Sequence, residues 1–413
     1  MGVPALEETT EQEVMRASGL MARVWHLLRS ILVPVAAVMV AMLIGAIIVS
    51  ATGGSPIQTY YYLAIGALGN PLNISETLVA ATPLALTGLS VAFAFQCGLF
   101  NIGAEGQLIM GAIAGTVVGT TLNWPAPWLI IAVLLAGALA GSVWGGIAGA
   151  LKALTGANEV VTTIMLNYIA IFFSNYLLER AGPLQLEVPG QVPGTGATVS
   201  PPLHAGAVLP PLVPGGLYRV HWGIAVPLTC ALIYWFILKR TTLGYEIRAV
   251  GLSPKAARYA GINVKRNMFL AMAIAGAIAG LAGIVAIQGL FPHQMFDVYN
   301  ADTTGFDGIG VALLGRNTAI GTLLTAILFG GLDHGGQVMQ FGAGTPSNLV
   351  SIIQALILFA ISAQFVRYLR IRLPSPSRSP ETPEVMPSLE KVTDTWETTA
   401  SDSVINLPED HSG

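Results

Sequence analysis

The stretch "ILVPVAAVMVAMLIGAIIVS", residues 31–50, decides the fold class of this 413-residue chain. It contains no charged residue and is apolar on every face, so it has neither the alternation of a membrane β-strand nor the polar face of a soluble helix. Twenty residues of α-helix extend about 30 Å, the thickness of a bilayer's hydrocarbon core. A helix also satisfies its own backbone polar groups, as lipid requires. The stretch therefore predicts a membrane-spanning helix.

The rest of the chain has the same character. Hydrophobic residues make up 53% of it and charged residues only 10%, against about 25% charge in soluble domains. Charged residues are absent from seven long stretches, namely 30–75, 77–104, 106–151, 160–178, 220–238, 267–296 and 334–366. Each stretch is long enough for one apolar helix or more. The composition predicts an all-α, polytopic transmembrane helical bundle.

The bundle of helices is expected between residues 30 and 372, with about eight to ten spans. The ten stretches that we expect to span are 30–51, 77–98, 106–123, 126–151, 160–179, 221–238, 267–289, 305–315, 318–332 and 349–366. The stretch 305–315 is too short to cross unaided. "TYYYLAIGALG", 59–69, is better explained as a re-entrant or interfacial helix.

The distribution of Lys and Arg predicts the orientation, because basic residues next to spans favour the cytoplasmic side. Arg23 and Arg29 place the segment 1–29 inside, and no cleaved signal pattern precedes the first span. The loop 239–266 carries seven basic residues against Glu246, so it is also cytoplasmic. The Pro- and Gly-rich loop 180–220 is predicted to be external. The tail 373–413, rich in Ser, Pro, Thr and acids, is predicted to be disordered and cytoplasmic, as is typical of such compositions.

The cytoplasmic loop contains "GLSPKAARYAGINVKR", Gly251 to Arg266, which has the signals of a short helix. Ser253 is a suitable N-cap, and Pro254 suits the first helical position. Gly261 is the residue type found just past a helix C-terminus. A helix of about two turns is too short to be stable alone, so it must be held by other elements.

Two interpretations of this helix remain open. It is either an ordinary solvated loop or a docking helix that inserts in a groove on a partner. For the docking interpretation, a small, smooth surface would be provided by Ala256, Ala257 and Ala260, with Arg258 and Tyr259 beside it.

Five polar residues lie inside apolar stretches and are candidates for a polar pathway: Asn101, Glu105, Gln107, Thr163 and Asn167. A carboxylate at membrane depth suggests function. The alternative is structural, with Asn101 and Glu105 capping helix ends near Gly103 and Gly106, and the others joining helices. Both interpretations can hold together.

Other chemistry is missing from the sequence. There is no G-x-x-x-x-G-K-[ST] motif to cradle ATP, the six His have no zinc spacing, and no nucleophile–base grouping is present. Cys97 and Cys230 both lie in apolar stretches, so no disulfide framework is indicated. We expect no catalytic residue, no metal, no cofactor bound by this chain and no nucleic acid partner.

Two stretches share an entry that combines aromatic, polar and Gly residues and is followed by a Gly/Ala-rich span. They are "GLFNIGAEGQLIMGAIAGTVVG" (98–119) and "TGFDGIGVALLGRNTAIGTLLTAILFGG" (304–331). Transporters are often built from such repeated halves, so a pseudo-repeat of two halves is expected. Glycines four residues apart, as in Gly141/Gly145, predict close helix packing.

The segment 241–264, "TTLGYEIRAVGLSPKAARYAGINV", resembles the coupling-helix region of permease subunits of bacterial ABC importers. The resemblance is to the branch for branched-chain amino acids, ribose-type sugars and nucleosides. "PLALTGL" (83–89), "GLFNIGAEGQ" (98–107), "NEVVTTIMLNYI" (158–169) and "VALLGRN" (311–317) resemble its simple-sugar/nucleoside members in particular.

This resemblance implies a multi-pass subunit of the bacterial inner membrane with both termini cytoplasmic. It implies four kinds of neighbour: two ATPase subunits that bind ATP, a second permease that is a copy or a paralogue, an extracytoplasmic substrate-binding protein, and the lipid bilayer. ATP binding would drive alternating access through the coupling helix, which here comprises Ser253, Pro254, Ala256, Ala257, Arg258 and Gly261. The expected substrate is a nucleoside or related sugar. The alternatives are a secondary transporter of small polar solutes and a permease for branched-chain amino acids.

Overall fold

The computed structural model describes residues 35, 36, 38–179, 182–186, 198–290, 292–295 and 303–359. The segments predicted as a cytoplasmic N-terminus (1–29) and a disordered acidic tail (373–413) lie outside the described residues. Within these residues the regular structure is helical, and the bridge between Pro211 and His221 does not extend into a strand.

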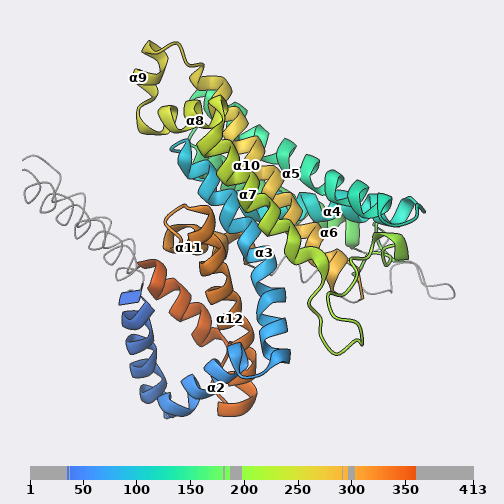
Figure 1. Cartoon of the computed structure of the whole chain (residues 1–413), viewed down its shortest axis with the longest axis vertical. Coiled ribbons are helices and arrows are strands. Elements are labelled where there is room, and N and C mark those ends of the chain that lie inside the picture. Colours follow the sequence, from blue (N-terminus) through green and yellow to red (C-terminus); the bar gives the residue numbers. More distant parts are fainter. Residues whose placement is uncertain are drawn as a thin grey trace, which may run out of the picture. The chain divides into compact units, whose positions relative to one another are not determined.

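Figure 1 shows the order of the described helices along the chain. The first and last are the apolar helices Val38–Ala51 and Asn348–Phe359. Between them lie α2 (Pro56–Leu68), α3 (Pro71–Gln96), α4 (Ala104–Thr121), α5 (Trp128–Thr155), α6 (Glu159–Leu178), η1 (Ala205–Ala207), η2 (Trp222–Ile224), α7 (Ala225–Arg240), α8 (Thr242–Leu252), α9 (Pro254–Tyr259), α10 (Val264–Gly289), α11 (Thr304–Leu314) and α12 (Ala319–Ala343).

Five of the described helical segments are long and apolar enough to cross a membrane. They are α3, α5, α6, the joined η2–α7 segment Trp222–Arg240, and α10. The prediction of an all-α, polytopic membrane protein is therefore confirmed. The number of crossings, eight to ten, stays a prediction. The short element expected at 305–315 is the 11-residue helix α11, and the helix expected at 59–69 is α2.

The expected end of one span is wrong. We expected a helix over 318–332, but α12 continues to Ala343. Its second half is rich in Gly and polar residues, which weakens the apolar signal, yet tertiary packing holds it in a helix. Gly335 packs against the backbone of Leu63, and Asp333 accepts a hydrogen bond from Gln354 Nε2 at 2.7 Å.

Helices α4, α5 and α10 pack through glycines with their backbones almost in contact. A Cβ atom placed on Gly141 of α5 would lie 2.2 Å from the carbonyl oxygen of Gly276 on α10. A Cβ on Gly111 of α4 would lie 2.2 Å from the oxygen of Gly280. The four-residue glycine spacing therefore permits the close approach that it predicted. These three helices and α3 carry most of the larger buried apolar core.

A second apolar core joins the helices Val38–Ala51 and Asn348–Phe359, α2, α11 and α12 with part of α3. Figure 1 shows α2 and α12 adjacent, with α3 running beside α11 and α12. Because α3 belongs to both cores, it links the glycine-packed helices to the helices around α12. Its C-terminal end leads into the segment that holds the candidate polar residues.

Candidate functional site

The chain turns sharply between α3 and α4. Gly98 has a positive φ of 73°, and α4 begins only at Ala104. A Cβ on Gly98 would lie 3.3 Å from the Cα of Gly251 in α8, which leaves little space for a side chain. The irregular segment 97–103 exposes backbone polar groups in the interior of the bundle, and these groups need partners.

Two amide side chains of this segment bind each other. Asn101 Nδ2 donates to Gln107 Oε1 and Gln107 Nε2 donates to Asn101 Oδ1, each at 2.9 Å. Asn101 also donates to Ser90 Oγ on α3 at 3.2 Å. The reciprocal pair joins the irregular segment to the first turn of α4 and fixes its path against α3.

Asn167 of α6 performs the capping that we had assigned to Asn101 and Glu105. Its Oδ1 accepts from the backbone N–H of Gly106, and its Nδ2 donates to the carbonyl of Ile102, both at 2.9 Å. No side chain caps α4 at Gly103 itself. One side chain from another helix thus satisfies both a donor and an acceptor at the break.

Thr163 lies one turn before Asn167 on the same buried face of α6. Its hydroxyl donates to the carbonyl of Glu159 at 2.7 Å, within its own helix. A Cβ atom placed on Gly103 would lie 3.0 Å from the Cβ of Thr163, so Thr163 packs directly against the irregular segment.

The side chain of Glu105 binds the N-terminus of a different helix, α11. Its Oε2 accepts a hydrogen bond of 2.7 Å from the backbone N–H of Gly305, in the first turn of α11. The Glu105 side chain is buried, with 2% of the residue exposed. A carboxylate at a helix N-terminus interacts favourably with the helix dipole. It also accepts a hydrogen bond from an N–H group that has no partner within α11. The two stretches predicted to be repeat partners therefore meet at their helix N-termini, although the repeat itself stays a prediction.

The five predicted pathway residues are thus brought together around one helix break. All five are buried, between 0% and 2% exposed. In this conformation their polar atoms bind the protein's own groups, so the structural interpretation holds for the contacts described. A direct contact with substrate stays a prediction.

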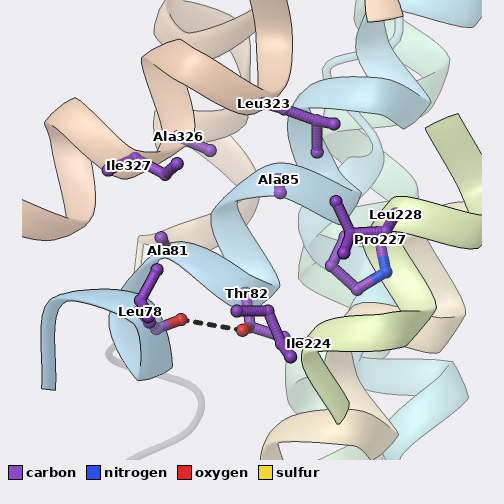
Figure 2. Close-up of a pocket in the computed structure, with 10 residues that line it drawn as sticks. All are labelled: Leu78, Ala81, Thr82, Ala85, Ile224, Pro227, Leu228, Leu323, Ala326 and Ile327. Atoms are coloured by element: carbon purple, nitrogen blue, oxygen red, sulfur yellow. Dashed lines mark hydrogen bonds between the residues drawn. The ribbon is translucent and has the colours of Figure 1, made fainter. Parts of the chain in front are cut away.

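A small apolar crevice lies elsewhere, between α3, α7 and α12 (Figure 2). Its volume is about 80 Å³. The one hydroxyl in its lining, that of Thr82, donates to the carbonyl of Leu78 in its own helix. The crevice offers no free polar group to orient a polar solute.

The predicted cytoplasmic helix is present as α9. Ser253 Oγ accepts from the backbone N–H of Ala256 at 3.3 Å, Pro254 is the first helical residue, and Gly261 has a φ of 80°. The capping signals in the sequence therefore predicted this helix and both of its ends correctly.

The outward surface of α9 matches the predicted one at Ala256, Arg258, Tyr259 and Ala260, which are exposed, and differs from it at Ala257. Ala257 is only 3% exposed, so it faces the rest of the protein and does not belong to an outward surface. A helix this short must bury one face to be stable, and Ala257 lies on that face. The side chains that project outward are Tyr259 (94% exposed) and Leu252 (89% exposed). Ser253, Pro254, Ala256, Arg258 and Gly261 surround them in sequence.

The hairpin of α8 and α9 is fixed to the helix bundle. A Cβ on Gly251 would lie 2.2 Å from the carbonyl oxygen of Gln96, the last residue of α3. Glu246 Oε2 accepts from Asn267 Nδ2 of α10 at 2.8 Å. The hairpin therefore contacts the chain directly before the irregular segment 97–103, which contains Asn101 and leads into α4.

The described part of the predicted external loop packs on the start of α3. The backbone N–H of Val220 donates to Ser75 Oγ at 3.1 Å, and Arg219 forms a 3.0 Å ion pair with Glu76. His221 Nδ1 accepts from the N–H of Gly223 at 3.1 Å. Burial, with the nearby charges of His293 and Arg219, lowers the pKa of His221 to about 4.

Comparison with known proteins identifies the family. Residues 73–362 match the family model described as "Branched-chain amino acid transport system / permease component". This match covers more than half of the chain. The chain belongs to this family of ABC transporter permeases. Membership makes the permease a multi-pass membrane protein and excludes the secondary-transporter alternative.

Three relatives cover most of the permease. The guanosine ABC transporter permease protein NupP of Bacillus subtilis is 41% identical over 84% of this chain and 97% of its own length. The nucleoside ABC transporter permease protein NupB of Lactococcus lactis is 38% identical over 82% and 92%. The glucose ABC transporter permease protein TsgB13 of Haloferax volcanii is 36% identical over 85% and 92%. No solved structure matches the permease significantly.

Proposed function

We propose that this permease forms the transmembrane pathway of an ATP-driven importer of nucleosides. The observation that carries the proposal is the 41% identity, over 84% of this chain and 97% of the relative, to a permease named for guanosine. The polar side chains within the described spans are mostly uncharged, which suits a neutral, polar solute. A strongly charged substrate would need opposing charges at membrane depth.

A simple sugar is the second candidate substrate, because a relative of 36% identity is named for glucose. Sugars and nucleosides both present hydroxyl groups, and hydrogen bonds to neutral groups, worth about 0.5–1.5 kcal/mol each, would serve either. A branched-chain amino acid is favoured only by the description of the family model.

The energy for transport would come from separate ATPase subunits, since the sequence contains no G-x-x-x-x-G-K-[ST] loop that could bind ATP. The surface we assign to them is the α8–α9 hairpin, where the exposed Tyr259 and Leu252 lie among Lys255, Arg258 and other basic residues. Such a surface fits a partner groove that is apolar at its centre and acidic at its rim.

The remaining partners follow from the ABC permease family. A second permease, a copy or a paralogue, would complete the pathway, and a substrate-binding protein would dock on the loop 180–220. In this proposed arrangement both termini and the α8–α9 hairpin would lie in the cytoplasm, and the loop 180–220 would lie outside.

The test is uptake by the complete complex in proteoliposomes with internal ATP. Guanosine, ribose, glucose and leucine are supplied in turn with the cognate binding protein. We expect ATP-dependent uptake of guanosine. Uptake of leucine alone would overturn the substrate assignment, whereas guanosine uptake that needs an ion gradient and no ATP would overturn the ATP-driven mechanism.

A further inference from the structure

Helix α11 begins near the middle of the bundle. The hydroxyl of Thr87 donates to the carbonyl of Thr304 at 3.1 Å, and Thr87 lies nine residues before Gln96, the last residue of α3. At 1.5 Å per residue, Thr304 is about 14 Å from that end of α3 and about 24 Å from the other. At the far end of α11, the carbonyl of Asn317 accepts from Gln96 Nε2 at 3.0 Å. α11 therefore spans only the half of α3 toward Gln96.

The first two turns of α11 have two different faces. One face is packed into the protein: Gly305 lies against Glu105, and a Cβ on Gly308 would lie 2.6 Å from the Thr87 hydroxyl oxygen. The other face is open. Phe306 is 41% exposed, Asp307 is half-buried, and Thr303 is exposed and donates to Asp307 Oδ2 at 3.1 Å.

An acid that is partly open at this depth requires an explanation. A carboxylate facing lipid at membrane depth costs several kcal/mol, so such residues face a polar cavity or pathway. A helix-capping role alone does not account for it, because Glu105 already supplies a negative charge at the N-terminus of α11 from the buried side. The exposed side of Asp307 is therefore the side on which we expect a polar space.

We propose that Phe306 and Asp307 form a contact site for a nucleoside on its way through the permease. The flat ring of Phe306 stacks on the base, and the Asp307 carboxylate accepts hydrogen bonds from the ribose hydroxyls. An aromatic ring beside a hydroxyl acceptor fits a solute that has a flat ring at one end and hydroxyl groups at the other.

The assignment to a nucleoside rests on the proposed function, while the site itself rests on the position and exposure of these two side chains. A sugar would also present hydroxyls to Asp307, so the uptake of sugar and of nucleoside by the same complex must be compared.

The experiment uses the complete complex in proteoliposomes and compares ATP-driven uptake of guanosine with that of 2′,3′-dideoxyguanosine, which lacks the 2′- and 3′-hydroxyls of the ribose. The variants are Phe306→Leu, Phe306→Tyr and Asp307→Asn. The matched control is Phe341→Leu, because Phe341 is an exposed Phe near the C-terminal end of α12 and is not part of the proposed site. All variants use the same binding protein, so its own selectivity cancels when a variant is compared with the unaltered complex. Gel filtration and Tm establish that each variant assembles.

We expect Phe306→Leu to lower the uptake of both solutes about fivefold or more, and Phe306→Tyr to retain it, since both rings can stack. Asp307→Asn should reduce the preference for guanosine over the dideoxy compound by about tenfold. Phe341→Leu should transport as the unaltered complex does. If assembled Phe306→Leu and Asp307→Asn both match the unaltered complex on both solutes, the site is wrong and the proposed function stands. If the unaltered complex takes up sugar but no nucleoside, both the proposed function and the nucleoside site are overturned.

Discussion

The carboxylate of Glu105, at the start of α4, binds the backbone N–H of Gly305, at the start of α11, over 2.7 Å. The two residues are 200 positions apart in the sequence. A Cβ on Gly305 would lie 2.4 Å from the backbone nitrogen of Glu105, so the two helix ends are in direct contact. One hydrogen bond thus connects the glycine-packed helices with the helices around α12.

Replacement of Glu105 distinguishes a structural role for its carboxylate from a role in the substrate pathway. In Glu105→Gln the side-chain oxygen can still accept from Gly305, so we expect assembly and Tm close to those of the unaltered permease. Glu105→Leu leaves the N–H of Gly305 buried without this partner, at a cost of about 1–3 kcal/mol. The measurement is Tm with uptake for both variants. Normal stability of Glu105→Leu would contradict the structural role, and lost uptake by a stable Glu105→Gln would assign Glu105 to the pathway.

The contact between α5 and α10 predicts a contrast between two neighbouring glycines. In Gly141→Ala the new Cβ meets the backbone oxygen of Gly276, which cannot move aside, so we expect a loss of more than about 1 kcal/mol. In Gly146→Ala the nearest atom is Phe269 Cε2 at 3.2 Å, part of a side chain that can turn. The better helix propensity of Ala offsets that cost. Thermal unfolding in detergent measures both, and equal Tm values would contradict the packing argument.

Local signals in the sequence predicted local features well. The Ser253, Pro254 and Gly261 signals gave α9 with both ends, because capping depends on a few adjacent residues. The extent of α12 was missed, because its second half is held by packing against α2 and not by its own apolarity. The pairing of Asn167 with Gly106 across 61 residues, and of Glu105 with Gly305, has no local signature at all. The sequence therefore predicted which residues are polar at depth, but not which groups they bind.

The buried His221 predicts that the stability of the permease depends on pH. Its pKa is lowered to about 4 from an ordinary 6.5, so the unfolded chain binds a proton over that interval and the folded chain does not. Stability is therefore complete above about pH 6.5 and falls as the pH drops toward 4, by about 1–2 kcal/mol at pH 5. We expect Tm to fall from pH 7 to pH 5, and His221→Gln to have a smaller fall. An identical pH dependence of Tm in both proteins would remove His221 as its source.

The proposed orientation predicts opposite labelling of two single cysteines. Leu217, in the loop 180–220, and Leu252, in the α8–α9 hairpin, are both exposed. Cys97 and Cys230 are buried and should give little background. An impermeant thiol reagent should label Leu217→Cys in intact cells and label Leu252→Cys only after the cells are opened. The reverse pattern would invert the assignment of the two sides.

The exposed Tyr259 predicts where the ATPase subunit binds most strongly. An aromatic side chain that is almost fully exposed on a fixed hairpin is typical of the residues that dominate interface energies. Tyr259→Ala should weaken the affinity for the ATPase by at least about tenfold and leave membrane insertion unchanged, since Tyr259 makes little contact with the rest of the permease. The control is Tyr168→Ala, which removes an exposed Tyr from α6, away from the hairpin. Affinity is measured by titrating purified ATPase onto the permease in nanodiscs. If both variants bind the ATPase as the unaltered permease does, Tyr259 is not the anchor and the docking surface must lie elsewhere on the cytoplasmic side.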